Sequence, residues 1–134
     1  MAVINSASPV IKNIDSVQKI ILSKHEKKLY AFYNHQVTSI DLNTFKTKSV
    51  SFDKQSFDIQ KFTFINTDTR NYFLDNQGGG VLLFENDSIY RVDNSFRHRM
   101  QFNSSIFAYN GKVYKYGGYG FWSHRNFITV FEPE

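Results

Sequence analysis

The sequence contains no cysteine, only two prolines and four alanines, and no long uninterrupted apolar stretch. Without cysteine the chain cannot form a disulfide framework, a thiolate-ligated zinc site or a thiol nucleophile. No apolar run approaches the roughly 18 to 20 residues that a membrane-spanning helix needs, so we expect no membrane segment. Alanine is the best helix former, and its scarcity counts against a helical bundle.

Aromatic residues take the place of the missing helix formers. The chain has 14 Phe and 8 Tyr among 134 residues, with 41% hydrophobic and 21% charged residues overall. Phe and Tyr favour the pleated surface of a strand, and this composition is that of a globular protein of about one domain. The sequence therefore predicts a soluble, all-β domain.

A repeat of 42 residues organises the chain. Tyr30, Tyr72 and Tyr114 each begin the aromatic part of a short strand, and they are spaced by 42 and again by 42 residues. Each of these strands follows an apolar strand and a polar turn, and the turn Asn110-Gly111 is a strong hairpin signal because both residues tolerate a positive φ. A fourth strand is predicted in the first unit. The predicted strands are 20–22, 28–33, 37–41, 45–52, 62–65, 71–75, 88–93, 106–109, 112–116 and 127–132.

The third strand of each unit is expected to end in an acid, at Asp41, Asp93 and Glu132. A carboxylate that recurs at equivalent strand ends favours hydrogen bonding in turns over catalysis. The second unit is the least regular, because Gly78 to Gly80 interrupt it and the apolar residues 81–84 could form an extra hairpin. Its boundary between residues 76 and 103 stays open at this stage.

Short strands with a repeat near 42 residues are typical of β-propeller blades, in which neighbouring sheets stack and bulky side chains fill the space between them. We expect an N-terminal extension (1–15) and three approximate blades (16–57, 58–103 and 104–134). A β-sandwich or small barrel of about ten strands is the competing architecture.

The third unit resembles a Kelch repeat. Residues 110–120, with the double glycine Gly117-Gly118 after a hydrophobic strand, are similar to the second strand of that family, and residues 126–133 are similar to its third strand. The resemblance implies an all-β, Kelch-type propeller of which about three blades are present, a partial or incomplete ring. The glycine pair is expected to serve backbone geometry, since no helix follows to cradle a phosphate.

Propellers usually close with four to eight blades. Three units are too few, so we expect either that the chain is a fragment with missing blades or that copies self-associate to complete the ring. The fragment is the favoured explanation.

No catalytic constellation is recognisable. The four histidines lack metal-ligand spacing, and no serine lies in a Gly-x-Ser-x-Gly context. We expect no catalytic residue, no metal and no cofactor, and hence no enzyme.

The candidate binding residues lie in loops between second and third strands. They are His35, Tyr119, Trp122, His124 and Arg125. Aromatic and Arg side chains are enriched at interaction hot spots. Trp122, the only tryptophan, could also pack between blades, because Trp is usually well buried.

These residues predict a non-catalytic protein-interaction or sensing module with a protein partner. The alternative is a carbohydrate-binding or enzyme-associated propeller that uses the loop 119–125. Nucleic acid is an unfavoured partner, because the tightest cationic cluster, residues 24–28, is expected to be a solvated hairpin tip. Residues 1–10 do not resemble a signal peptide, which favours a cytoplasmic location.

Overall fold

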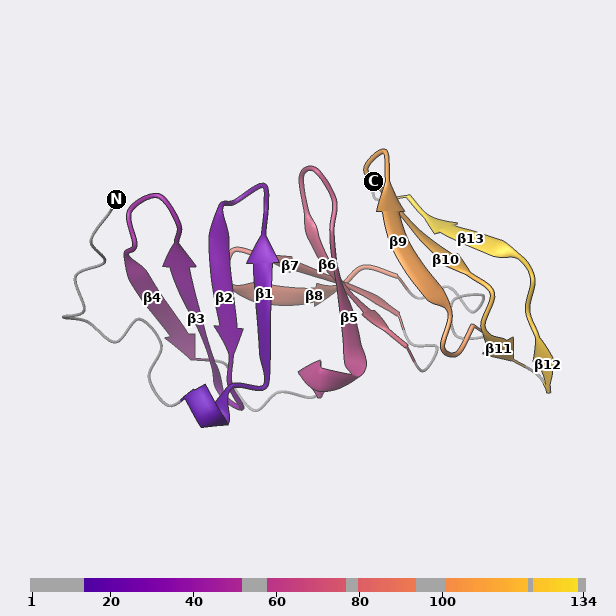
Figure 1. Ribbon diagram of the computed structural model, residues 1–134, viewed down its shortest axis with the longest axis horizontal. Coiled ribbons are helices and arrows are strands. Elements are labelled where there is room, and N and C mark those ends of the chain that lie inside the picture. The colour runs from indigo at the N-terminus through magenta and orange to yellow at the C-terminus, as the bar shows by residue number, and fades with distance from the viewer. Residues whose placement is uncertain (1–13, 52–57, 77–79, 94–100, 121, 133–134) are drawn as a thin grey trace, which may run out of the picture.

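The protein is all-β in the parts that the structure describes. The computed structural model describes residues 14–51, 58–76, 80–93, 101–120 and 122–132. Within these residues there are strands and two short 3-10 turns, η1 (Ile14–Ser16) and η2 (Ile59–Lys61), and no α-helix. The strands are short and antiparallel, and the larger sheets are arranged one after another along the molecule (Figure 1).

The first sheet is a four-stranded meander. Its strands follow one another in sequence order, and Tyr30 on the second strand lies opposite Ile21 on the first. Asp41 ends the third strand, and its carboxylate accepts the backbone N–H groups of Asn43 and Thr44 at 2.9 and 2.8 Å, which holds the turn into the fourth strand. The strands are β1 (Lys19–Ser23), β2 (Lys28–Phe32), β3 (Gln36–Asp41) and β4 (Thr47–Ser51).

The second sheet repeats this meander and corrects one prediction. The apolar residues near Val81 form the third strand, and the segment predicted as the third strand is the fourth. The reason is a tight turn, because Asn86 and Asp87 both have a positive φ (51° and 59°) and join these two strands directly. The acid that ends the third strand is therefore Glu85, and Asp93 lies beyond the fourth strand. The strands are β5 (Phe62–Asn66), β6 (Asn71–Asp75), β7 (Val81–Glu85) and β8 (Ser88–Arg91).

The third sheet has three strands with a small hairpin inserted before the last one. Asn110 and Gly111 have φ values of 47° and 73°, which confirms the predicted turn between the first two strands. The sheet order is β13-β10-β9, and β11 pairs with β12 in the separate hairpin. The strands are β9 (Ser105–Tyr109), β10 (Lys112–Tyr116), β11 (Tyr119–Gly120), β12 (Ser123–His124) and β13 (Ile128–Phe131).

The tyrosines of the repeat occupy equivalent places. Tyr30, Tyr72 and Tyr114 lie on β2, β6 and β10, the second strands of three separate sheets. The first and third tyrosine-led hairpins thus belong to different sheets, as the stacking hypothesis requires. No closed ring is formed by the strands that the structure describes.

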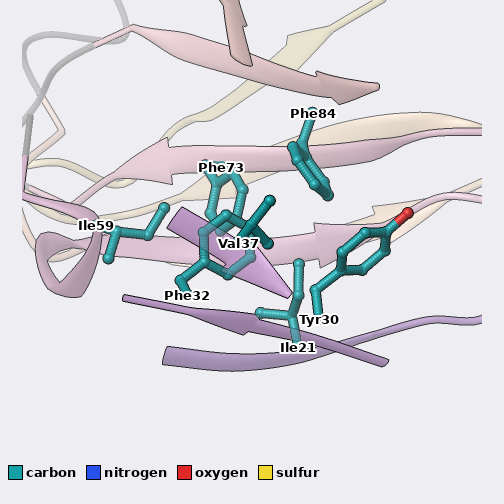
Figure 2. Packing of buried hydrophobic residues seen from close by; sticks show 7 residues of the cluster. All are labelled: Ile21, Tyr30, Phe32, Val37, Ile59, Phe73 and Phe84. Atoms are coloured by element: carbon teal, nitrogen blue, oxygen red, sulfur yellow. The ribbon is translucent and has the colours of Figure 1, made fainter. Parts of the chain in front are cut away.

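Aromatic side chains fill the space between the first two sheets. Phe32 of β2 meets Phe73 of β6 edge to face, with ring centroids 5.5 Å apart, and Tyr30 meets Phe84 of β7 at 4.8 Å. Figure 2 shows these rings pointing toward one another from the two sheets, with Ile59 of η2 beside them. Each ring removes a large apolar area from water, and the edge-to-face geometry adds to this stabilisation.

A second core lies between the second and third sheets. Tyr72, Leu74, Val81, Leu83 and Val113 are its buried members, and side chains of β5, β9 and β13 pack against them. The strands β5 and β9 lie next to each other at this junction. The buried Lys115 of β10 donates a hydrogen bond to the backbone carbonyl of Asp75 at 3.3 Å, so one polar link crosses between these sheets.

No helix within the described residues is long and apolar enough to cross a membrane.

Candidate functional site

The hairpin β11–β12, together with the glycines before it and the residues up to Phe127 after it, carries four of the five predicted binding residues. We call residues 117–120 and 122–127 the aromatic hairpin. Figure 1 shows this segment at the end of the array that carries the third sheet, projecting beyond β10 and β13.

The double glycine fixes where the aromatic hairpin leaves the sheet. Gly117 and Gly118 have φ values of +70° and +91°, a region that other residues rarely adopt. A Cβ atom at Gly118 would lie 2.8 Å from the carbonyl oxygen of Phe102, so the backbones approach more closely here than a side chain permits. Tyr119 and Phe102 exchange two backbone hydrogen bonds of 2.8 and 2.9 Å at this place. The glycine pair therefore serves backbone geometry, as the sequence predicts.

Gln101 anchors the base of the aromatic hairpin. Its side chain is fully buried, and its amide nitrogen donates to the carbonyl oxygens of Gly117 at 3.2 Å and Phe127 at 3.3 Å. The Thr129 hydroxyl donates to the amide oxygen of Gln101. Glutamine is mostly an exposed residue, and no local pattern marks this one, so the sequence contains no signal that could have identified it. One buried amide thus ties the entry and the exit of the hairpin together.

Trp122 stands at the tip of the hairpin in solvent. Its side chain is 92% exposed and its φ is +64°. The alternative that it packs between sheets is wrong for the described residues, because so little of the indole is covered. A bulky residue in this conformation is an outlier and occurs mostly where neighbouring structure holds it. The indole is therefore free to meet a partner.

The other aromatic and cationic groups flank the tip. Tyr119 and His124 face each other across the hairpin, with ring centroids 5.6 Å apart at 71°, and both are exposed. The Arg125 guanidinium carbon lies 5.9 Å from the centre of the Phe127 ring, and the Arg125 backbone N–H donates to Gly118 at 2.8 Å. A cation over a ring gains electrostatic stabilisation and loses mobility. These contacts hold the flanking groups in fixed positions.

The charge of the aromatic hairpin is positive. The sequence from Gly117 to Phe127 contains Arg125 and His124 and no Asp or Glu. A segment with an exposed indole, a guanidinium and no carboxylate suits an acidic partner with apolar groups.

His35 does not belong to this surface. It is exposed in the turn between β2 and β3, where the backbone N–H of Tyr33 donates to Gln36 at 2.9 Å. This turn belongs to the first sheet, whereas the other four predicted residues share the aromatic hairpin. The structure thus groups Tyr119, Trp122, His124 and Arg125 and leaves His35 apart.

The predicted turn role of the strand-end acids holds for one of the three. The hydrogen bonds from Thr44 and Asn43 hold the pKa of the Asp41 carboxyl below its usual value. Glu132 instead forms an exposed ion pair with Lys112 at 2.5 Å. Asp93 is not a third-strand residue.

Two other segments singled out in the sequence have different outcomes. The Lys-rich residues 24–28 do form the tip between β1 and β2, as predicted, although Glu26 turns inward to accept hydrogen bonds from Tyr30 at 3.1 Å and Asn71 at 2.7 Å. In the second unit, the loop residues 77–79 and residues 94–100 of the boundary left open between 76 and 103 lie outside the described residues.

The site offers no metal-ligand cluster, since no group of three His, Asp or Glu side chains comes together in the described residues. No protein-family model matches the chain, and the comparison with curated proteins finds no match.

Proposed function

We propose that the chain is a non-catalytic protein-interaction module built on a partial Kelch-like β-propeller, with the aromatic hairpin as its contact surface. The consecutive meanders, the tyrosine repeat and the double glycine after β10 support the propeller part of this proposal. The observation that carries the functional part is Trp122, which is 92% exposed at the tip of a braced hairpin.

The aromatic hairpin is held in one conformation before binding, and this supports a partner of defined shape. Trp, Tyr and Arg dominate the energetics of protein interfaces. The buried Gln101 and the paired backbones at Gly118 hold the hairpin in place before binding, so less conformational entropy is lost when a partner docks. The absence of carboxylates from the segment favours a partner surface that combines acidic and apolar groups.

A peptide-display selection tests this proposal. The immobilised chain is the bait, and the Trp122→Ala protein is the matched control. We expect the wild type to enrich peptides that contain Asp or Glu next to apolar residues, and the control to lose that enrichment. Because Trp122 is the only tryptophan, titration of an enriched peptide changes a single, assigned fluorescence signal. Enrichment that is equal on both proteins would place binding elsewhere and contradict the proposal.

Carbohydrate is the second candidate ligand, because an exposed indole ring with Ser123 and His124 beside it also offers a flat apolar face next to polar groups. A glycan array with the same two proteins separates the candidates. Saturable glycan binding that disappears in the Trp122→Ala protein supports the carbohydrate function, and its absence alongside peptide enrichment supports the protein partner.

A further inference from the structure

Both ends of the sheet array expose apolar side chains. For each of the three larger sheets, we call the face that carries the repeat tyrosine the forward face and the opposite face the backward face. The exposed apolar residues on the forward face of the third sheet are Phe107, Tyr109, Tyr116, Ile128 and Val130. The backward face of the first sheet exposes Ile20 and Leu22 on its edge strand β1, while its middle is already buried at Ala31 and Ile40.

Inside the chain, sheets pack forward face against backward face, and they do so twice. At the first junction, Ile21 of the first sheet and Phe64 of the second belong to one core cluster. At the second junction, Ile65 of the second sheet and Ile106 of the third pack against another cluster. In each case two residues from the first strands of neighbouring sheets share one core cluster. One of them points forward from its sheet, and the other points backward from the next sheet.

The register makes these residues equivalent. Ile21, Ile65 and Phe107 lie opposite Tyr30, Tyr72 and Tyr114 respectively. The residue before each of them in the chain points to the backward face, because side chains alternate along a strand. This places Ile20 in the position of Phe64 and Ile106.

Two members of this series have no following or preceding sheet among the described residues. Phe107 is 43% exposed, whereas its equivalents Ile21 and Ile65 pack between sheets. Ile20 is 49% exposed, whereas its equivalents Phe64 and Ile106 pack between sheets. Phe107 is held in place by Tyr114, on which it stacks with ring centroids 5.1 Å apart and an interplanar angle of 7°. One end of the array therefore presents the forward residue of a junction, and the other end presents the backward residue.

Charge does not oppose a contact between these faces. The charged side chains at the border of the forward face are Lys112 and Glu132, and they neutralise each other in an ion pair of 2.5 Å. The exposed part of the backward face on β1 is aliphatic. Burial of both surfaces removes apolar area from water without stranding an unpaired charge.

We infer that the chain self-associates head to tail, with the forward face of the third sheet of one copy on the backward face of the first sheet of a second copy. In this contact β9 lies beside β1 of the other copy, as β5 lies beside β9 within the chain. Phe107 then meets the surface at Ile20 as Ile65 meets the surface at Ile106. Such a heterologous contact uses a different surface on each copy.

Two variants and one control test this contact by sedimentation velocity and light scattering over a concentration series. Ile20→Lys disables only the backward face, and Phe107→Asp disables only the forward face. The control is Phe45→Asp, which alters a 71%-exposed residue in the turn between β3 and β4, outside the strands that form the two faces. We expect the wild type and the control to form species larger than the chain. Each single variant should associate at least roughly tenfold more weakly, since a half-exposed large side chain loses its burial.

A mixture of the two variants gives the decisive result. Each variant keeps the face that the other has lost, so one intact contact can form between them and no second one can follow. The mixture should therefore form a heterodimer of twice the chain mass at concentrations where each variant alone stays monomeric. Far-UV circular dichroism and the melting temperature confirm that each variant is folded, and Ile20→Ser and Phe107→Ser replace any variant that is not.

Several results would overturn the inference. A wild type that stays monomeric over the whole series would do so. Association that survives Ile20→Lys and is lost only in Phe107→Asp would show that two forward faces meet each other. Failure of the mixture to associate would also contradict it. Trp122→Ala should leave self-association unchanged, so this test and the test of the aromatic hairpin fail independently.

Discussion

Substitution of Gly118 by alanine tests how the aromatic hairpin is held. At this position an added Cβ atom would lie 2.8 Å from the carbonyl oxygen of Phe102 and 3.1 to 3.2 Å from backbone atoms of Gln101, and the φ of +91° is also unfavourable. Gly111 is the matched control, because its φ is +73° and a Cβ atom there would meet nothing within 4 Å. Both variants carry the conformational cost, and only one carries the clash.

The expected magnitudes follow from this difference. A left-handed conformation costs a residue with a Cβ atom about 1 to 2 kcal/mol, so Gly111→Ala should lower the free energy of unfolding by about that amount. Gly118→Ala should cost about 1 to 2 kcal/mol more, because backbone atoms of Gln101 and Phe102 must move. Urea unfolding followed by circular dichroism measures both values. Equal losses in the two variants would show that close backbone approach does not hold the hairpin, and would refute this reasoning.

Four further substitutions probe the packing between sheets. Tyr30→Phe should lower the free energy of unfolding by about 1 kcal/mol, because it removes the hydrogen bond to Glu26. Tyr72→Phe should be nearly neutral, because the buried Tyr72 hydroxyl has no hydrogen-bond partner among the described residues. The urea midpoints of the two variants compare these effects directly. Phe32→Ala should cost about 3 to 5 kcal/mol as it opens a cavity between the first two sheets, and a loss below about 1 kcal/mol in thermal unfolding would contradict the packing described. Burial lowers the pKa of the Lys115 ammonium, so between the lowered pKa and the ordinary value near 10.5 the unfolded chain binds more protons than the folded one, and this residue's contribution to stability should rise with pH. The difference in unfolding free energy between the wild type and Lys115→Met should therefore shift in favour of the wild type from pH 7 to pH 10. A pH-independent difference would show that the ammonium is not desolvated.

Local patterns explain why much of the strand order was predictable. The turn Asn110-Gly111 and the short aromatic strands that each follow an apolar strand and a polar turn are local features of the chain, and the hairpins β1–β2, β5–β6 and β9–β10 formed as expected. The prediction failed at the third strand of the second sheet. There the glycines before Val81 suggested an interruption, so the hairpin through Asn86 and Asp87 was only an open alternative; the structure shows that it joins two paired strands of the sheet.

The candidate site was predictable only in outline. The loop was identified from its aromatic and cationic residues. The exposure of Trp122 could not be predicted, because Trp is usually buried and composition does not show which residue occupies the tip of a hairpin. Gln101 reaches the hairpin from 16 and 26 residues away in the chain, so no local pattern connects them. His35 was grouped with His124 because both were expected in loops between second and third strands; His35 does lie between β2 and β3, but in the first sheet, apart from the aromatic hairpin.

The fluorescence of Trp122 tests the central claim most directly. As the only tryptophan, it reports on the hairpin tip without ambiguity. The account predicts an emission maximum close to that of free tryptophan in water and efficient quenching by acrylamide in the folded protein, with little change in the maximum on unfolding. A blue-shifted, poorly quenched emission that moves to the red on unfolding would mean that the indole is buried, and the aromatic hairpin could not then act as the contact surface.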